Sequence, residues 1–262
     1  MTQIQSLPEA LSGLRVAAPA SVATGALVEL GFADRYAETS SPLGPIFVAW
    51  NGLGVSWVSK AGDAATFERQ FNDHLGRPIS PAHALPVKLA SAIERRLAGD
   101  RRVKIALDLR GSTSFEAAVW RKALEIPRGE VRPYGWIAAE IGHPKAVRAV
   151  GSALAHNPVP LVVPCHRVVR SDGHIGQYSL GGPDNKRRIL AAEGLDPTWL
   201  ESEAARGVRF IGSDTTKIVC HPTCRDARRV TPRHRVPFAS LAAARAAGYR
   251  PCRHCRPVSL AA

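Results

Sequence analysis

The 262-residue sequence lacks any run of about 18 apolar residues. Its first ten residues also lack the basic start and the apolar stretch of a secretory leader. With 45% hydrophobic and 22% charged residues, the composition excludes disorder along the whole chain. We therefore expect a soluble, cytoplasmic protein with no membrane partner.

Acidic residues are scarce in one part of the chain only. Residues 206–262 hold 12 Lys and Arg against 2 Asp and Glu, whereas residues 1–205 hold 23 against 20. The last stretch therefore carries most of the net charge of +13. Such a local excess favours a polyanionic partner, most simply nucleic acid, although a solvated basic tail would give the same count.

Cysteine is scarce as well, and four of the five cysteines lie in the basic tail, as Cys220-x3-Cys224 and Cys252-x2-Cys255. Because a cytoplasmic protein keeps its thiols reduced, two closely spaced pairs are typical of a structural zinc site rather than of disulfides. We expect one Zn²⁺ on these sulfurs, in a small module over residues 206–258. Three histidines are second-choice ligands: His221, His234 and His254.

The first part of the chain, residues 1–110, has the pattern of a small α/β domain that follows an N-terminal extension. Runs typical of strands cover residues 46–50, 54–58 and 103–109, and helical periodicity covers residues 64–75 and 87–97. No group of residues in this part has a spacing that indicates catalysis.

Residues 111–198 predict a domain rich in helices. Helices are expected near residues 115–124, 134–141 and 145–156, and a tight turn at Gly142 joins the last two. Helical spacing places one set of residues on the buried face of the third helix: Ala146, Ala149, Val150, Ala153 and Leu154.

Two short helices with a glycine turn between them indicate a helix-turn-helix, although an ordinary helical hairpin has the same pattern. In the DNA-binding interpretation, the second helix would present cations and small residues to DNA: Lys145, Arg148, Gly151 and Ser152.

The fifth cysteine, Cys165, follows an apolar run at residues 161–163 that predicts a buried strand ended by Pro164. His166 and Arg167 come next, and a nearby base or positive charge favours the nucleophilic thiolate. Because adjacent residues of a strand face opposite ways, we expect His166 to act through a bend or a bridging water. An inert buried cysteine and a stray zinc ligand are the alternatives.

Two further features follow Cys165 in the sequence. Residues 168–170 and 174–175 flank a Ser-Asp-Gly turn, which predicts a hairpin. Pro183 begins a helix that reaches Glu193, where a carboxylate opposes the helix dipole. That misfit suggests that Glu193 has a role elsewhere.

The segment Pro164-Cys165-His166-Arg167-Val168-Val169, preceded by Asn157-Pro158, resembles the active-site segment of the O6-alkylguanine-DNA alkyltransferases, also called methylated-DNA–protein-cysteine methyltransferases. The resemblance covers about residues 36–195. Further matching motifs are Ser41-Pro42-Leu43-Gly44-Pro45, Pro144-Lys145-Ala146-Val147-Arg148-Ala149-Val150-Gly151 and Gly176-Gln177-Tyr178-Ser179.

The resemblance implies an RNase H-like N-terminal domain and a winged helix-turn-helix catalytic domain that flips a damaged base out of double-stranded DNA. Cys165 would take the alkyl group irreversibly from O6-alkylguanine, and from O4-alkylthymine, in a single turnover. His166 would relay the thiol proton through water, and Glu193 would orient the imidazole. No organic cofactor is implied, and the protein would act as a monomer associated with the nucleoid.

The same resemblance assigns roles to residues around the base pocket. Arg148 would enter the base stack, while Tyr134 would rotate the target phosphate and act as a donor to the departing guanine. Asn157 would be the hinge between the active-site segment and the recognition helix. The remaining contacts to the base would come from Ser179, from Tyr178 as a wall, and from the carbonyls of Cys165 and Val168. Two departures from the family pattern affect this region: Pro133 stands before Tyr134, and Leu180 lengthens the stretch after Ser179.

Residues 210–257 resemble the zinc domain of Ada-type adaptive-response proteins, most closely at Gly248-Tyr249-Arg250-Pro251-Cys252. In that domain the first zinc cysteine, here Cys220, removes methyl groups from DNA phosphotriesters. The resemblance therefore implies a module that assists DNA binding, with Cys220 as an alternative methyl acceptor.

The sequence as a whole predicts a DNA repair alkyltransferase with an appended zinc module. A transcription regulator that senses methylation through Cys165 or Cys220 is one alternative, but we expect no further regulatory domain after the module, which favours repair. A protein that binds lesions without chemistry is another, and the reactive thiol argues against it.

Overall fold

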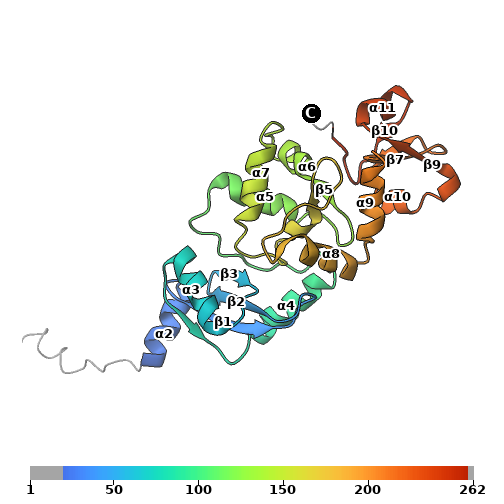
Figure 1. Ribbon diagram of the computed structural model, residues 1–262. Coiled ribbons are helices and arrows are strands. Elements are labelled where there is room, and N and C mark those ends of the chain that lie inside the picture. Colours follow the sequence, from blue (N-terminus) through green and yellow to red (C-terminus); the bar gives the residue numbers. More distant parts are fainter. Residues whose placement is uncertain (1–19, 259–262) are drawn as a thin grey trace, which may run out of the picture.

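The computed structural model describes residues 20–258, so the expectations for the first ten residues lie outside the described residues. Figure 1 shows three parts in chain order, with a helical part between an N-terminal sheet and a small C-terminal sheet. Within residues 20–258, no helix has the length and apolar character needed to cross a membrane.

The N-terminal part is a four-stranded sheet of order β3-β2-β1-β4, in which only β4 runs parallel to its neighbour. Its elements are α2 (Ala20–Glu29), β1 (Asp34–Thr39), β2 (Ile46–Asn51), β3 (Gly54–Ser59), α3 (Ala64–Leu75), β4 (Ile79–Pro81) and α4 (Val87–Leu97). The expected α/β class, the strands near residues 46–50 and 54–58 and both helices are confirmed. The strand expected over residues 103–109 is wrong, because this segment meets the edge of β3 only at an isolated bridge between Val55 and Leu107.

Both faces of this sheet are covered. On one face, Phe67 and Phe71 of α3 are fully buried against Tyr36, Phe47 and Ala49, and each such side chain contributes about 1.5–3 kcal/mol of burial. The other face shares one continuous core with the helical part, which includes Val48 and Val58 of the sheet and Val119, Ala153 and Val163 beyond it. The sheet therefore serves as a platform for the helices.

The helical part contains the elements that surround Cys165. They are α5 (Ser114–Ala123), β5 (Arg132–Pro133), α6 (Tyr134–Glu140), α7 (Val147–Ala155), the 3-10 turn η1 (Cys165–Arg167), β6 (Val168–Val169) and α8 (Gly182–Ala192). The helix α5 begins at a capping box between Thr113 and Glu116. The three expected helices are confirmed, with α6 and α7 starting or ending within two residues of the expected bounds.

Two positions of the expected buried face of α7 are wrong. Val150, Ala153 and Leu154 are buried, but Ala149 is exposed, and Ala146 is half-buried at the N-cap, just before the helix. Successive helical residues are about 100° apart, so the stripe that contains Val150 and Leu154 turns Ala149 away from the core.

The chain around Cys165 is less extended than the sequence suggested. Residues 161–163 form a buried turn rather than a strand, because Leu161 adopts a left-handed φ of 73° and Val163 donates to the carbonyl of Val159. Cys165 then opens the turn η1 instead of following a strand. The expected hairpin is also reduced to a turn, in which Arg170 donates to His174, while β6 pairs in parallel with β5.

The C-terminal part is a second four-stranded sheet of order β10-β8-β7-β9, reached through the helix α9 (Pro197–Ala205). Its elements are β7 (Phe210–Ser213), β8 (Ile218–Cys220), α10 (Arg225–Arg228), the 3-10 turn η2 (Pro232–His234), β9 (Arg235–Phe238), α11 (Leu241–Ala246) and β10 (Arg250–Pro251). Figure 1 shows this sheet beside the end of the helical part that carries α6 and β5.

Candidate active site and metal centre

Cys165 lies at a cavity of about 240 Å³ between α7 and the segment that precedes α8. The thiol is 5% exposed and is held from behind by Asn157, whose amide donates to Sγ at 3.2 Å and to the carbonyl of Val163 at 3.1 Å. The cavity is lined by Tyr134, Gly151, Leu154, Ala155, Cys165, Gln177, Tyr178 and Ser179. The structure thus gathers Asn157, Cys165, Tyr134, Tyr178, Ser179 and Gly151 at one place.

Burial has the largest effect on the pKa of the Cys165 thiol. It raises the pKa of Cys165 above its usual value, and the hydrogen bond from Asn157, the charge of Lys186 and a hydrogen bond with Ser179 oppose the rise. The resting thiol is therefore protonated at neutral pH, so a base must take its proton when it reacts.

His166, beside it on η1, is the candidate for that base. Its Nε2 lies 3.0 Å from Oε1 of Glu193, and Arg167 donates to the same carboxylate at 2.6 Å. Burial raises the pKa of Glu193, but the hydrogen bonds and charges of His166 and Arg167 outweigh it and lower the pKa to about 2. An ionised carboxylate accepts the Nε2 proton, which leaves Nδ1 as the basic nitrogen.

Nδ1 of His166 is buried and has no partner among the described residues. Burial lowers the pKa of His166, so the imidazole is neutral near pH 7 and can accept a proton. The position of Glu193 at the end of α8 now has a structural account, because the carboxylate accepts hydrogen bonds from His166, Arg167 and the backbone of Gly129.

Sequence reasoning missed Lys186, a buried cation of the site in addition to Arg167. The side chain is 0% exposed, and its ammonium donates to the carbonyls of Val168 at 2.7 Å and Gln177 at 3.2 Å. Burial lowers its pKa to about 8, while the charge of Cys165 acts in the opposite direction. A signal was present in the sequence, since Lys186 lies three and four residues before Ile189 and Leu190 on the buried stripe of α8.

The aromatic residues form the cavity wall. Tyr134 begins α6 directly after β5, and burial raises its pKa. Tyr178 meets the ring of His166 edge-on, with 6.1 Å between ring centroids, and its hydroxyl has no partner among the described residues. The carbonyl of Val168, expected to accept from a guanine, already accepts from Lys186 but keeps a second acceptor position.

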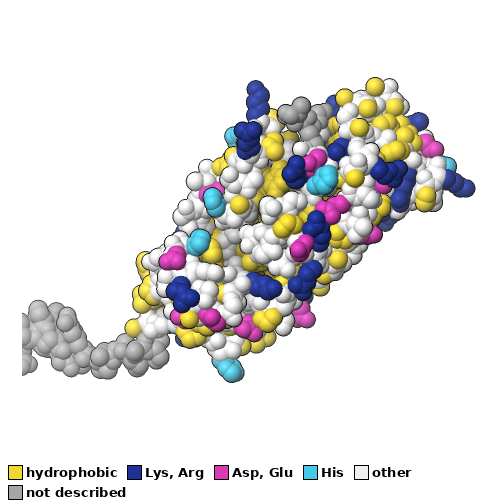
Figure 2. Space-filling model, in the orientation of Figure 1, with side chains coloured by type: hydrophobic (Ala, Val, Ile, Leu, Met, Phe, Trp, Pro, Cys, Tyr) yellow, Lys and Arg dark blue, Asp and Glu magenta, His cyan; other side chains and the backbone are white. Residues whose placement is uncertain are grey.

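The residues expected to meet DNA lie on the outer side of α7 and before it. Lys145, Arg148 and Ser152 are exposed, and Gly151 borders the cavity. Figure 2 shows basic side chains that project from the top of the molecule over the connection of α6 and α7. The exposed face of α7 therefore leads from solvent to the mouth of the Cys165 cavity.

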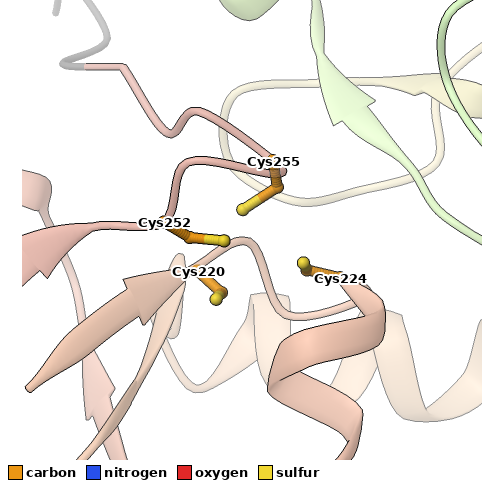
Figure 3. Close-up of side chains that lie close together, drawn as sticks. All are labelled: Cys220, Cys224, Cys252 and Cys255. Atoms are coloured by element: carbon orange, nitrogen blue, oxygen red, sulfur yellow. The ribbon is translucent and has the colours of Figure 1, made fainter. Parts of the chain in front are cut away.

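The four tail cysteines converge on one point, as Figure 3 shows. They are buried, and their Sγ atoms all lie within 4.8 Å of one another. Tetrahedral Zn²⁺ with bonds of about 2.3 Å places sulfurs about 3.8 Å apart, so this donor set fits the ion. We conclude that Cys220, Cys224, Cys252 and Cys255 form a zinc site.

The histidines near this cluster lie outside the set of four converging sulfurs. His221 packs against Phe210 at 5.4 Å between ring centroids, and His234 bonds to Asp214 at 2.8 Å. His254 lies near Cys224 and Asp226, so it neighbours the cluster without replacing a cysteine in it. A cavity of about 370 Å³ borders the cluster, and Cys220 is the cysteine that lines it.

Two family models match the chain. Residues 114–195 match the 6-O-methylguanine DNA methyltransferase, DNA binding domain, and residues 200–258 match the metal binding domain of Ada.

Individual relatives extend this likeness. A methylated-DNA–protein-cysteine methyltransferase of Methanosarcina acetivorans is 35% identical over 167 residues, which cover 61% of this chain and 97% of that protein. One from Mycolicibacterium paratuberculosis is 54% identical over 89 residues, which cover 34% of this chain and 53% of that protein. The chain thus spans about half the length of this and several other relatives that it matches.

A solved structure adds to these comparisons. It is a variant of the Mycobacterium tuberculosis O6-methylguanine methyltransferase, with a TM-score of 0.50 and 34% identity, and the match covers 61% of this chain and 92% of that one.

Proposed function

The chain belongs to the family of methylated-DNA–protein-cysteine methyltransferases, and from this premise we propose that it repairs DNA by moving the alkyl group of O6-alkylguanine irreversibly to Cys165. The observation that carries the proposal is the single thiol at the cavity, with a neutral imidazole next to it in the chain and a buried ammonium behind it. O4-alkylthymine would be a second substrate of the same site.

The chemistry requires one bond to form and one to break. Sγ of Cys165 attacks the alkyl carbon, and the bond from that carbon to O6 of guanine breaks. The thiol proton passes through a water to Nδ1 of His166, while Glu193 holds Nε2 and supports the resulting imidazolium. The departing guanine takes up a proton from Tyr134, and the proton held by His166 then returns through water to the tyrosinate, so that a thioether, an unmodified guanine and a neutral imidazole remain.

The helical part would bring the alkylated base to Cys165. We assign a winged helix-turn-helix to residues 111–198 and an RNase H-like domain to the part of residues 1–110 that follows the N-terminal extension. Arg148 on the exposed face of α7 would fill the stack when the base leaves it, and Lys145, Gly151 and Ser152 would lie along the phosphates. Asn157 would couple α7 to the cysteine, since it follows the helix and bonds to Sγ. Tyr178 and Ser179 would border the flipped base.

The test is incubation with duplex DNA that carries one O6-methylguanine, followed by mass spectrometry of the Cys165 peptide. We expect one added methyl group per molecule and no second turnover. The Cys165→Ser variant should gain no methyl while still binding the duplex. A wild-type peptide without the label would refute the proposal.

A second candidate activity is methyl transfer from DNA phosphotriesters to Cys220. The cavity of about 370 Å³ favours it, because Cys220 lines that cavity and the other three cysteines of the cluster do not. The basic module, residues 206–258, would bring the phosphates there, and bound zinc would keep the sulfurs as thiolates.

Cys165→Ser protein and duplex with a ¹³C-methyl phosphotriester separate this activity from the first. A label confined to the Cys220 peptide is expected, whereas an unlabelled peptide would leave the module with DNA binding alone.

A further inference from the structure

The loop between the first two zinc cysteines packs directly on the helical part. Thr223 lies between Cys220 and Cys224 and is 1% exposed. Its hydroxyl accepts from the backbone N–H of Val131 at 2.9 Å and lies 3.4 Å from the carbonyl of the same residue. One zinc-loop side chain thus meets both backbone polar groups of Val131.

A buried carboxylate makes the neighbouring contact. Glu130 accepts from the backbone N–H of Arg225 at 3.1 Å with one oxygen and from Arg132 with the other. Glu130 and Arg132 are 1% and 2% exposed. A buried polar group that loses its hydrogen-bond partner destabilises the fold. The contact therefore fixes the backbone of residues 130–132 against the zinc loop.

The segment held in this way belongs to the alkyl acceptor site. At one end, Gly129 donates its N–H to Oε2 of Glu193 at 3.1 Å. At the other end, β5 leads straight into Tyr134 and pairs with β6, which follows Cys165–Arg167. The zinc loop therefore touches the middle of a short segment whose two ends reach the proton relay and the base cavity.

We propose that Thr223 is a positioning residue, through which the zinc-bound loop sets residues 129–134 and thereby the rate of alkyl transfer at Cys165. Zinc would then be needed for the chemistry of a cysteine that does not bind it. As far as it concerns rate, the inference rests on the proposed function of Cys165. A rigid tether that only keeps the module nearby is the competing explanation.

The test compares three variants of the full chain. Thr223→Val keeps the shape but removes the hydroxyl, Thr223→Ser restores the hydroxyl, and Thr198→Val changes an exposed threonine of α9 as a matched control. We expect Thr223→Val to keep its zinc while the single-turnover rate constant at Cys165 falls about tenfold, since small misplacements of reacting groups are costly. Thr223→Ser should recover most of the rate, and Thr198→Val should match the wild type.

Removing zinc from both the wild type and Thr223→Val completes a cycle that combines the two changes. A chelator should slow the wild type at least as much as Thr223→Val does, and should slow Thr223→Val by a smaller factor, because the two changes break the same connection. Equal factors in both proteins, or an unchanged rate in Thr223→Val, would overturn the inference.

Hydrogen exchange supplies a readout that does not depend on alkyl transfer. The peptide that covers residues 128–134 should exchange faster in Thr223→Val and in zinc-depleted wild type, with α3 unchanged. If the wild type transferred no alkyl group, the proposed function would fail while this measurement still decided the coupling. Unaltered exchange in residues 128–134 would refute it.

Discussion

Cys165 and the four cysteines of the C-terminal part are all buried thiols, yet their neighbours give them opposite chemistry. Cys220, Cys224, Cys252 and Cys255 have one another within 4.8 Å. Cys165 instead meets an amide, a hydroxyl and the charge of a lysine, and it borders a cavity. Sulfurs this close to one another can hold a cation together, whereas Cys165 has polar and charged neighbours in place of other sulfurs.

The largest expected effect separates the two kinds of thiol by stability. Cys255→Ser should release zinc and unfold residues 206–258, because metal binding contributes about 10 kcal/mol or more to the folding of such small modules. Cys165→Ser is the matched control and should keep its zinc and its midpoint of thermal unfolding within a few degrees. Zinc content and scanning calorimetry measure both, and full zinc occupancy in Cys255→Ser would contradict the four-sulfur site.

The second effect concerns the carboxylate behind Cys165. The pKa of Glu193 is lowered from 4.5 to about 2, so its contribution to stability is fully present above pH 4.5 and is lost as the pH falls towards 2. The shift corresponds to about 3 kcal/mol. Glu193→Gln should therefore be less stable than the wild type at pH 7, and the difference should shrink between pH 5 and pH 3.

Urea unfolding at several pH values measures this difference. Glu201→Gln is the control, because Glu201 also pairs with an arginine but is more exposed. A difference between Glu193→Gln and the wild type that stays constant with pH would show that the carboxylate is not ionised in the way the site requires.

The third effect tests the buried ammonium. Lys186→Met removes the cation whose charge favours the thiolate of Cys165, and it leaves the carbonyls of Val168 and Gln177 unpaired. We expect alkyl transfer to slow by about tenfold or more and its dependence on pH to move upwards. Lys88→Met changes an exposed lysine of α4 as a control. An unchanged pH profile would mean that Lys186 only supports the backbone.

The sequence showed the zinc cysteines as a site, but it did not show all the neighbours of Cys165. The spacing of the zinc cysteines identified their site because neighbouring ligands in the chain are neighbours in space. Helices α3 and α4 were predicted over their full lengths because their apolar spacing is regular. Contacts between distant segments had no such signal. Helical spacing could have shown that Lys186 is buried, but not that it lies near Cys165, and nothing in the spacing places Thr223 against Val131.

The prediction of a strand at residues 161–163 was wrong for a related reason. This apolar run is buried as a strand would be, but the left-handed backbone of Leu161 is set by the packing around it rather than by local preference. Ala149 was also predicted wrongly, because it is apolar like its buried neighbours and differs from them only in its angle around α7.

The smallest expected effect is a change in zinc affinity when an exposed arginine of the zinc module is replaced. Arg253 lies between Cys252 and Cys255, and like the buried Lys186 it is a cation close to thiols, but its side chain is exposed. Water and salt screen an exposed charge, so Arg253→Met should change the zinc affinity by no more than about threefold. Competition with a chromophoric chelator at low and high salt measures it. A tenfold loss that disappears at high salt would show that exposed arginines, and not only the sulfur geometry, balance the charge of the cluster.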